Sequence, residues 1–273
     1  KHVWDRLAEL GIPPSPIADD ATFLRRVCLD TIGTLPGVDG TRKFLADKDP
    51  AKRNKLVAGL LERDEYADYW AMKWADVLRV DNQKLTPQVT VAITRWLRRQ
   101  MAENVPYDRF ASEIVTVRGN TRSETPAAIY TVLKSPEELA RSVSQLFLGV
   151  RIECAQCHHH PFEKWAQRDY FALAGFFTGV KRGGAPGGGQ KITDVAGSDL
   201  KHPRSGQPVP TSGLGSDPIT LDDPSGRRRA FSEWMTAAEN PFFARTIANR
   251  LWAHYFGRGL VEPIDDMRET NPA

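Results

Sequence analysis

The stretch Arg151–Trp165, RIECAQCHHHPFEKW, organises the rest of the chain. It contains Cys154-Ala155-Gln156-Cys157-His158, two cysteines three positions apart with a histidine directly after the second. Covalent attachment of a c-type haem needs this spacing, because the two thiols add to the two vinyl groups and the next imidazole binds the iron. The motif therefore predicts Cys154 and Cys157 as haem attachment points and His158 as the proximal iron ligand.

Two other interpretations of the motif stay open at this stage. A tetrahedral zinc ion accepts Cys154, Cys157 and one or two of the three consecutive histidines, although no second ligand pair lies at zinc-finger spacing. Two cysteines at this spacing also form a structural disulfide or a redox dithiol, but the usual strand-then-helix context is not evident around them. Haem c, with its iron, is the favoured cofactor and zinc is the alternative.

The segments around the motif carry helical signals. Asp19 or Asp20 can cap a helix whose apolar face includes Cys28, and Gly33 can end it. Ser135-Pro136-Glu137-Glu138 is a capping box with proline at the first helical position, and the helix that it opens leads straight into the motif. We therefore expect a mainly α fold, a multi-helix domain with a long Gly/Pro-rich loop, in which Cys28 is a small core residue.

The expected domain boundaries follow from a change in composition. Residues 1–182 form a helical cytochrome c-like domain, residues 183–226 a Gly/Pro-rich loop, and residues 227–273 the C-terminal helices, which either begin a following domain or pack on the first. The run GGAPGGG at Gly183–Gly189 is expected to hold no regular element. Short strands near Ile192 and Val209 fit the pattern, but no strand ladder is predicted.

The last predicted helix supplies the candidate for the distal iron ligand. It begins at Asn240-Pro241, ends at Gly257, and places Ile247, Leu251, His254 and Tyr255 on one face. His254 is the first candidate because it lies on the apolar side of the helix rather than among charges. The alternative is a buried histidine that is satisfied by hydrogen bonds.

The overall charge excludes one class of partner. The 273 residues carry 37 basic and 34 acidic side chains, a net charge of +3 that is too small and too dispersed to favour nucleic acid. Arginine clusters such as Arg95, Arg98 and Arg99, and the run Arg227–Arg229, are expected to be solvated helix faces; a docking patch for an acidic redox partner is the functional alternative. No apolar run approaches the roughly 18 residues that cross a bilayer.

Four stretches of the chain are distinctive. They are FLRRVCLDTIGTLPG (Phe23–Gly37), YADYWAMKWADVLRV (Tyr66–Val80), RIECAQCHHHPFEKW (Arg151–Trp165) and NPFFARTIANRLWAHYFGRGLVEPIDDMRETNP (Asn240–Pro272). They resemble the cytochrome-like proteins that planctomycetes are expected to secrete: the first three resemble the cytochrome c-like domain of that family, and the fourth resembles the opening of the domain that commonly follows it. The resemblance implies haem and secretion, and it does not supply a reaction.

These observations predict a secreted or periplasmic c-type cytochrome domain that binds one covalent haem and passes electrons to a redox partner protein. The chain opens on the amphipathic KHVWDRLAELG, so we expect the leader that export requires to lie outside this sequence. One alternative is a haem enzyme with peroxidase-like or oxidative activity. The other is a zinc-stabilised binding module without catalysis.

Overall fold

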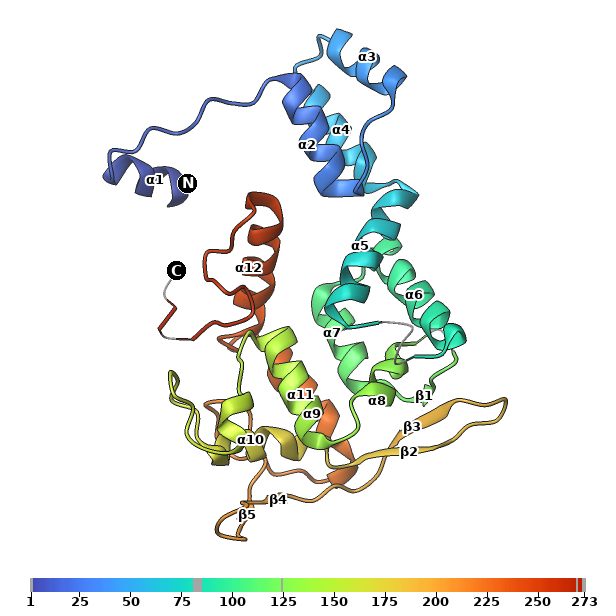
Figure 1. The fold of residues 1–273 in the computed structure, drawn as a ribbon, viewed down its shortest axis with the longest axis vertical. Helices are drawn as coiled ribbons and strands as arrows, with labels where there is room; N and C mark the ends of the chain where they lie inside the picture. Colours follow the sequence, from blue (N-terminus) through green and yellow to red (C-terminus); the bar gives the residue numbers. More distant parts are fainter. Residues whose placement is uncertain (1, 81–84, 124, 269, 272–273) are drawn as a thin grey trace. The chain divides into compact units, whose positions relative to one another are not determined.

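The structure is a computed structural model that describes residues 2–80, 85–123, 125–268 and 270–271. The chain divides into two compact units, residues 1–69 and residues 70–273. The described residues form twelve α-helices and only short strands, which confirms the mainly α fold class (Figure 1). None of the helices in these ranges has the length and apolarity needed to span a membrane.

The first unit is a small helical cluster. Its elements are α1 (His2–Glu9), α2 (Asp20–Ile32), α3 (Val38–Ala46), α4 (Lys52–Leu61) and the start of α5 (Asp64–Val77). The side chain of Asp19 accepts a hydrogen bond from Thr22 N at the start of α2, and Gly33 ends the helix with a φ of 71°, both as predicted. Cys28 is 2% exposed in a core with Phe44 and Leu60, so its prediction as a core residue is confirmed.

The second unit holds the main core and most of the helices. These are α6 (Pro87–Ala102), α7 (Tyr107–Thr116), α8 (Ile129–Val132), α9 (Pro136–Val143), α10 (Gln167–Ala174), α11 (Arg227–Thr236) and α12 (Phe243–Phe256). The largest fully buried side chain is Trp96, whose Nε1 donates to Glu113 Oε1 at 2.9 Å. The capping box predicted at the start of α9 is present, with Ser135 and Glu138 bonding each other's backbone N–H groups. The helix continues as a π-helical turn, η2 (Ser144–Leu148).

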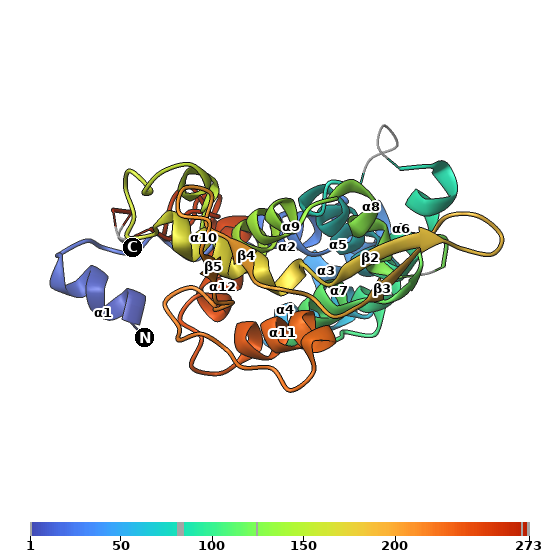
Figure 2. The ribbon, with the colours of Figure 1, turned by 90° about the horizontal axis from the view of Figure 1, so that it is seen from below.

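The Gly/Pro-rich segment forms more strand than its composition predicts. β1 (Gly119–Asn120), β3 (Gln190–Asp194) and β2 (Val180–Gly184) make an antiparallel sheet in that order, and β4 (Leu200–Lys201) pairs with β5 (Pro208–Val209). The strands expected near Ile192 and Val209 are confirmed. The prediction of no regular element in GGAPGGG is wrong for Gly183 and Gly184, which pair with Lys191 and Gln190. In both views the tip of the β2–β3 hairpin extends beyond the helices (Figures 1 and 2).

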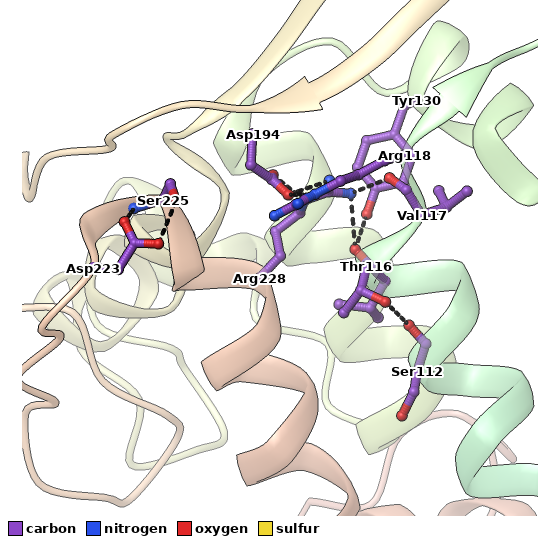
Figure 3. Close-up of polar contacts among 10 residues, drawn as sticks. Ser112, Thr116, Val117, Arg118, Tyr130, Asp194, Asp223, Ser225 and Arg228 are labelled. Atoms are coloured by element: carbon purple, nitrogen blue, oxygen red, sulfur yellow. Dashed lines mark hydrogen bonds and ion pairs between the residues drawn. The ribbon is translucent and has the colours of Figure 1, made fainter.

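The base of this hairpin is held by a buried arginine. Arg228, on α11, donates to both carboxylate oxygens of Asp194 at 2.6 and 2.9 Å and to the carbonyls of Val115 and Val117 at 3.0 and 2.9 Å (Figure 3). Its side chain is 2% exposed. The expectation that Arg227–Arg229 forms a solvated face is therefore wrong for Arg228, because β3 and the end of α7 supply enough acceptors to bury its charge. It is also wrong for Arg227, whose side chain is 11% exposed and pairs with Asp199 at 3.2 Å. Arg229 does face solvent.

The inward face of α12 also differs from the expectation. Phe243, Thr246 and Asn249 are buried, whereas Leu251 and Tyr255 are exposed. Asn249 accepts from Val261 N at 3.0 Å and donates to Val261 O at 2.8 Å. Asn249 thus turns inward because it binds the backbone of the segment that follows the helix, whereas Thr246 donates to Phe242 O one turn back at 2.9 Å. Apolar periodicity does not reveal such contacts.

Candidate functional site

The C-x-x-C-H motif lies on one short turn between η2 and α10. The turn is η3 (Glu153–Gln156), a 3₁₀ helix, and Ala155 N donates to Ile152 O at 2.9 Å within it. Ala155 is fully buried, while Cys154 and Cys157 are exposed. Residues three apart on a 3₁₀ turn lie one above the other. The buried alanine therefore anchors the turn and both thiols share its outer side.

His158 follows this turn with its ring exposed to solvent. Its Nδ1 lies 2.6 Å from the carbonyl oxygen of His159. A carbonyl oxygen only accepts, so Nδ1 donates in that hydrogen bond, and in the neutral imidazole Nε2 is then the nitrogen with the lone pair. Metal-binding histidines commonly have this arrangement, in which one ring nitrogen donates to a carbonyl and the other binds the metal.

The next residues close a small loop after the motif. His160 N donates to Trp165 O at 2.9 Å, and His160 Nδ1 accepts from Phe162 N at 3.2 Å. The ring of His160 thus has a structural partner inside the loop. His159 is exposed and contributes its carbonyl oxygen to the ring of His158.

Side chains of α9 and α10 hold the turn from outside. Gln167, at the start of α10, donates to Gln156 O at 2.7 Å. Arg141, on α9, pairs with Glu153 at 2.7 Å, directly before the first cysteine. Burial raises the pKa of Tyr170 to about 12, so this residue is neutral at ordinary pH and its hydroxyl donates to Glu137 O at 3.2 Å. The backbone of the motif is therefore fixed while its thiols and imidazole face solvent.

Comparison with protein families identifies the segment that carries this turn. The model PSCyt2, described as a protein of unknown function (DUF1549), matches residues 1–182. The chain belongs to the PSCyt2 family. The model PSD1, also described as a protein of unknown function (DUF1553), matches residues 227–273 beyond the PSCyt2 segment. Comparisons with curated proteins and with solved structures give no match.

The donor groups of the C-x-x-C-H motif fit covalent haem attachment. Cys154 and Cys157 are free thiols on one side of a fixed turn. The neighbouring imidazole presents Nε2, the nitrogen that a proximal histidine uses. Across residues 2–80, 85–123, 125–268 and 270–271, no three or more His, Cys, Asp or Glu side chains are grouped to hold a metal ion. Zinc stays the alternative cofactor.

The structure brings the three motif residues together and places His254 elsewhere. His254 lies in the last turn of α12, where its ring contacts Trp70 at 4.8 Å and Tyr255 at 4.9 Å between centroids. Figure 1 shows the end of α12 apart from the α9–α10 connection that carries the C-x-x-C-H motif. His254 is only partly buried. Its role as the distal ligand stays a prediction.

Sequence reasoning missed the residues that support the motif. Arg141, Glu153 and Gln167 have no distinctive spacing relative to the cysteines, and their contacts arise only when α9 and α10 pack against the turn. The sequence offered one signal, Glu153, because a charged side chain directly before Cys154 is placed to form an ion pair that holds the turn.

Proposed function

We propose that the PSCyt2 segment is a c-type cytochrome domain that works outside the cytoplasm and passes single electrons to a redox partner protein. Cys154 and Cys157 would hold one haem through thioether bonds, and His158 would bind its iron. The single observation that carries the proposal is the C-x-x-C-H turn, with both thiols and the imidazole exposed on a fixed backbone. Thioether attachment of haem takes place after export, which is why we place the domain in the periplasm or outside the cell.

Each residue of the turn has a defined task in this proposal. The haem, when bound, supplies a one-electron iron couple. Cys154 and Cys157 fix its position and prevent its loss, while the carbonyl of His159 orients the ring of His158 so that Nε2 faces away from the loop. Ala155 and Gln167 keep the turn rigid. A rigid attachment reduces the structural change that accompanies each electron transfer.

The test is maturation of the full chain with haem available. The chain would be exported to a periplasm that contains a cytochrome c maturation system, purified, and analysed by visible spectroscopy and by a pyridine haemochrome assay. We expect one covalent haem for each chain. Purified protein without a Soret band after such maturation would overturn the proposal.

Matched cysteine variants make the test specific. The double variant Cys154→Ser, Cys157→Ser should lose covalent haem, whereas Cys28→Ala should keep it because Cys28 is buried in the core of the first unit. His158→Ala should keep the thioethers but change the spectrum, because it removes an iron ligand. Equal haem content in the double variant and in the unmodified chain would show that the motif is not the attachment site.

The prediction for His254 is tested on the same material. If His254 is the distal ligand, the haem-loaded chain is six-coordinate and binds carbon monoxide slowly or not at all when reduced. His254→Ala should then open the site to carbon monoxide. Rapid binding by the unmodified chain, with no change in the variant, would exclude this role.

A further inference from the structure

An apolar pocket of about 360 Å³ lies in the second unit, apart from the cysteines. Its walls come from the end of α5 and from α6, α7, α8 and α9. They include the side chains of Ile93, Ile114, Ile129, Leu133, Val143 and Leu146. This volume falls in the range of roughly 300–1,000 Å³ that is typical of small-molecule sites. The walls indicate a ligand with an apolar body.

The lining of this pocket contains more arginines than acidic side chains. Arg79, Arg141 and Arg250 line it, and so do Glu138 and Asp265. Arg141 already pairs with Glu153 at 2.7 Å.

Both acids are bound by groups of the chain itself. Glu138 accepts from the backbone N–H groups of Lys134 and Ser135, and these hydrogen bonds lower its pKa. Asp265 accepts from Gln145 at 2.6 Å and pairs with Arg151. The charge of Asp265 is therefore balanced by Arg151, whereas Glu138 keeps its negative charge in the pocket wall. Among the described residues, Arg79 and Arg250 have no ion-pair partner, so two arginines face one carboxylate and the pocket has a net positive charge.

Arg250 gives the clearest sign of a missing partner. Its Nε is buried and has no hydrogen-bond acceptor among the described residues. Buried donors without acceptors are rare in folded proteins, and a bound ligand with an acceptor oxygen would satisfy this Nε–H group.

The wall formed by α9 has an unusual backbone. The helix changes to π-helical geometry at Ser144–Leu148, and Gln145 and Leu146 of this turn line the pocket. Single π-helical turns inside α-helices occur frequently at functional sites. This is a second observation, independent of the charges, that points to the same place.

We propose that this pocket binds a small amphipathic carboxylate, with its hydrocarbon body against the apolar walls and its carboxylate on the guanidinium of Arg250. Nε–H supplies one charge-assisted hydrogen bond, and the exposed Arg79 adds a second positive charge at the mouth. Glu138 and Asp265 stay bound to their own partners. The ligand site is separate from the proposed haem attachment and does not depend on it.

The test uses decanoate and 1-decanol as matched probes on the full chain, with binding measured by isothermal titration calorimetry. Decanoate should bind in a one-to-one complex, and the alcohol should bind about tenfold or more weaker because it cannot form the charged contact. Equal affinity for the two probes, or no binding of decanoate, would overturn the proposal.

Arginine variants locate the carboxylate. Arg250→Gln should weaken decanoate binding by about tenfold or more, while Arg258→Gln, an exposed arginine beyond the end of α12, should leave it unchanged. Because Arg250 is half-buried, its variant requires a folding check by circular dichroism. Arg79→Gln, at an exposed position, should weaken binding in a chain whose core is intact. Unchanged affinity in both pocket variants would refute the assignment.

The cysteine variant separates a free ligand from a haem propionate. The Cys154→Ser, Cys157→Ser chain and the haem-loaded chain should bind decanoate with the same affinity. Loss of binding only in the haem-loaded form would show that the porphyrin's own carboxylates fill the pocket, which would overturn the proposal of a separate ligand.

Discussion

Replacement of Arg228 by methionine tests how much the buried ion pair contributes to stability. Arg228→Met keeps most of the side-chain volume but removes two hydrogen bonds to Asp194 and two to the carbonyls of Val115 and Val117. The substitution leaves the carboxylate of Asp194, which is 6% exposed, with Arg118 as its remaining ion-pair partner at 2.7 Å. Removing one partner of a buried pair costs about 3–5 kcal/mol. Because Arg118 remains, we expect the lower end, about 3 kcal/mol.

The assay is urea unfolding followed by tryptophan fluorescence. The chain has 7 tryptophans, and all except Trp4 lie in the second unit, so fluorescence reports on the unit that contains the pair. Arg229→Met is the matched control, because that neighbouring side chain is 81% exposed and pairs with Glu233 one turn away. The control should change the free energy of unfolding by less than about 0.5 kcal/mol. Equal effects of the two substitutions would refute the reasoning.

A double-mutant cycle with Asp194→Asn isolates the pair itself. The double variant should lose less stability than the sum of the two single losses, because each single variant leaves a buried group without its partner. Additive losses would mean that Arg228 acts through its carbonyl contacts alone.

Three further predictions concern the helix that leads into the motif and use the same unfolding assay. Gly149→Ala should lower the free energy of unfolding by about 1–3 kcal/mol, because Gly149 has a φ of 62° and an added Cβ would lie 2.7 Å from Met267 Cγ; an unchanged value would contradict this. Ser135→Ala should cost about 1 kcal/mol, since its side chain accepts from Glu138 N at 3.1 Å. The pKa of Glu138 lies below its ordinary value of 4.5, so its stabilising effect is complete above that pH and is lost as the pH falls through the lower folded value. Glu138→Gln should remove this part of the acid-induced loss of stability, and parallel pH curves for the two proteins would argue against it.

Local signals in the sequence predicted the helix ends accurately. Asp19 and Gly33 mark the two ends of α2, and Ser135 marks the start of α9. These ends are predictable because caps depend on hydrogen bonds between residues a few positions apart. The grouping of Cys154, Cys157 and His158 follows from the same locality. Their support by Arg141 and Gln167 does not, since it requires two helices to pack against the turn.

Long-range polar contacts account for the wrong predictions. Three consecutive arginines predicted a solvated face, yet Arg228 is buried because its acceptors come from segments more than 30 positions away. Asn249 in α12 turns inward for a similar reason, as it binds the backbone of Val261. Apolar periodicity assumes that buried residues are apolar, and it fails where a polar side chain finds all of its partners inside the protein.

Arg141 allows the haem proposal and the ligand proposal to be tested against each other. It lines the apolar pocket and also pairs with Glu153, directly before Cys154. Glu153 is 67% exposed, so the pair contributes little to stability. The turn keeps its bonds from Gln167 to Gln156 and from Ala155 to Ile152 when Arg141 is removed. Arg141→Gln should therefore retain full covalent haem in the pyridine haemochrome assay.

The same variant should bind decanoate more weakly in calorimetry, because it removes one positive charge from the pocket. The loss should be smaller than for Arg250→Gln, since the charge of Arg141 is already balanced by Glu153. A chain that loses haem but keeps decanoate affinity would show the reverse, namely that Arg141 positions the cysteine turn and does not serve the pocket. Both readouts come from one purified protein, so a general folding defect, which would abolish both, is distinguished from either specific effect.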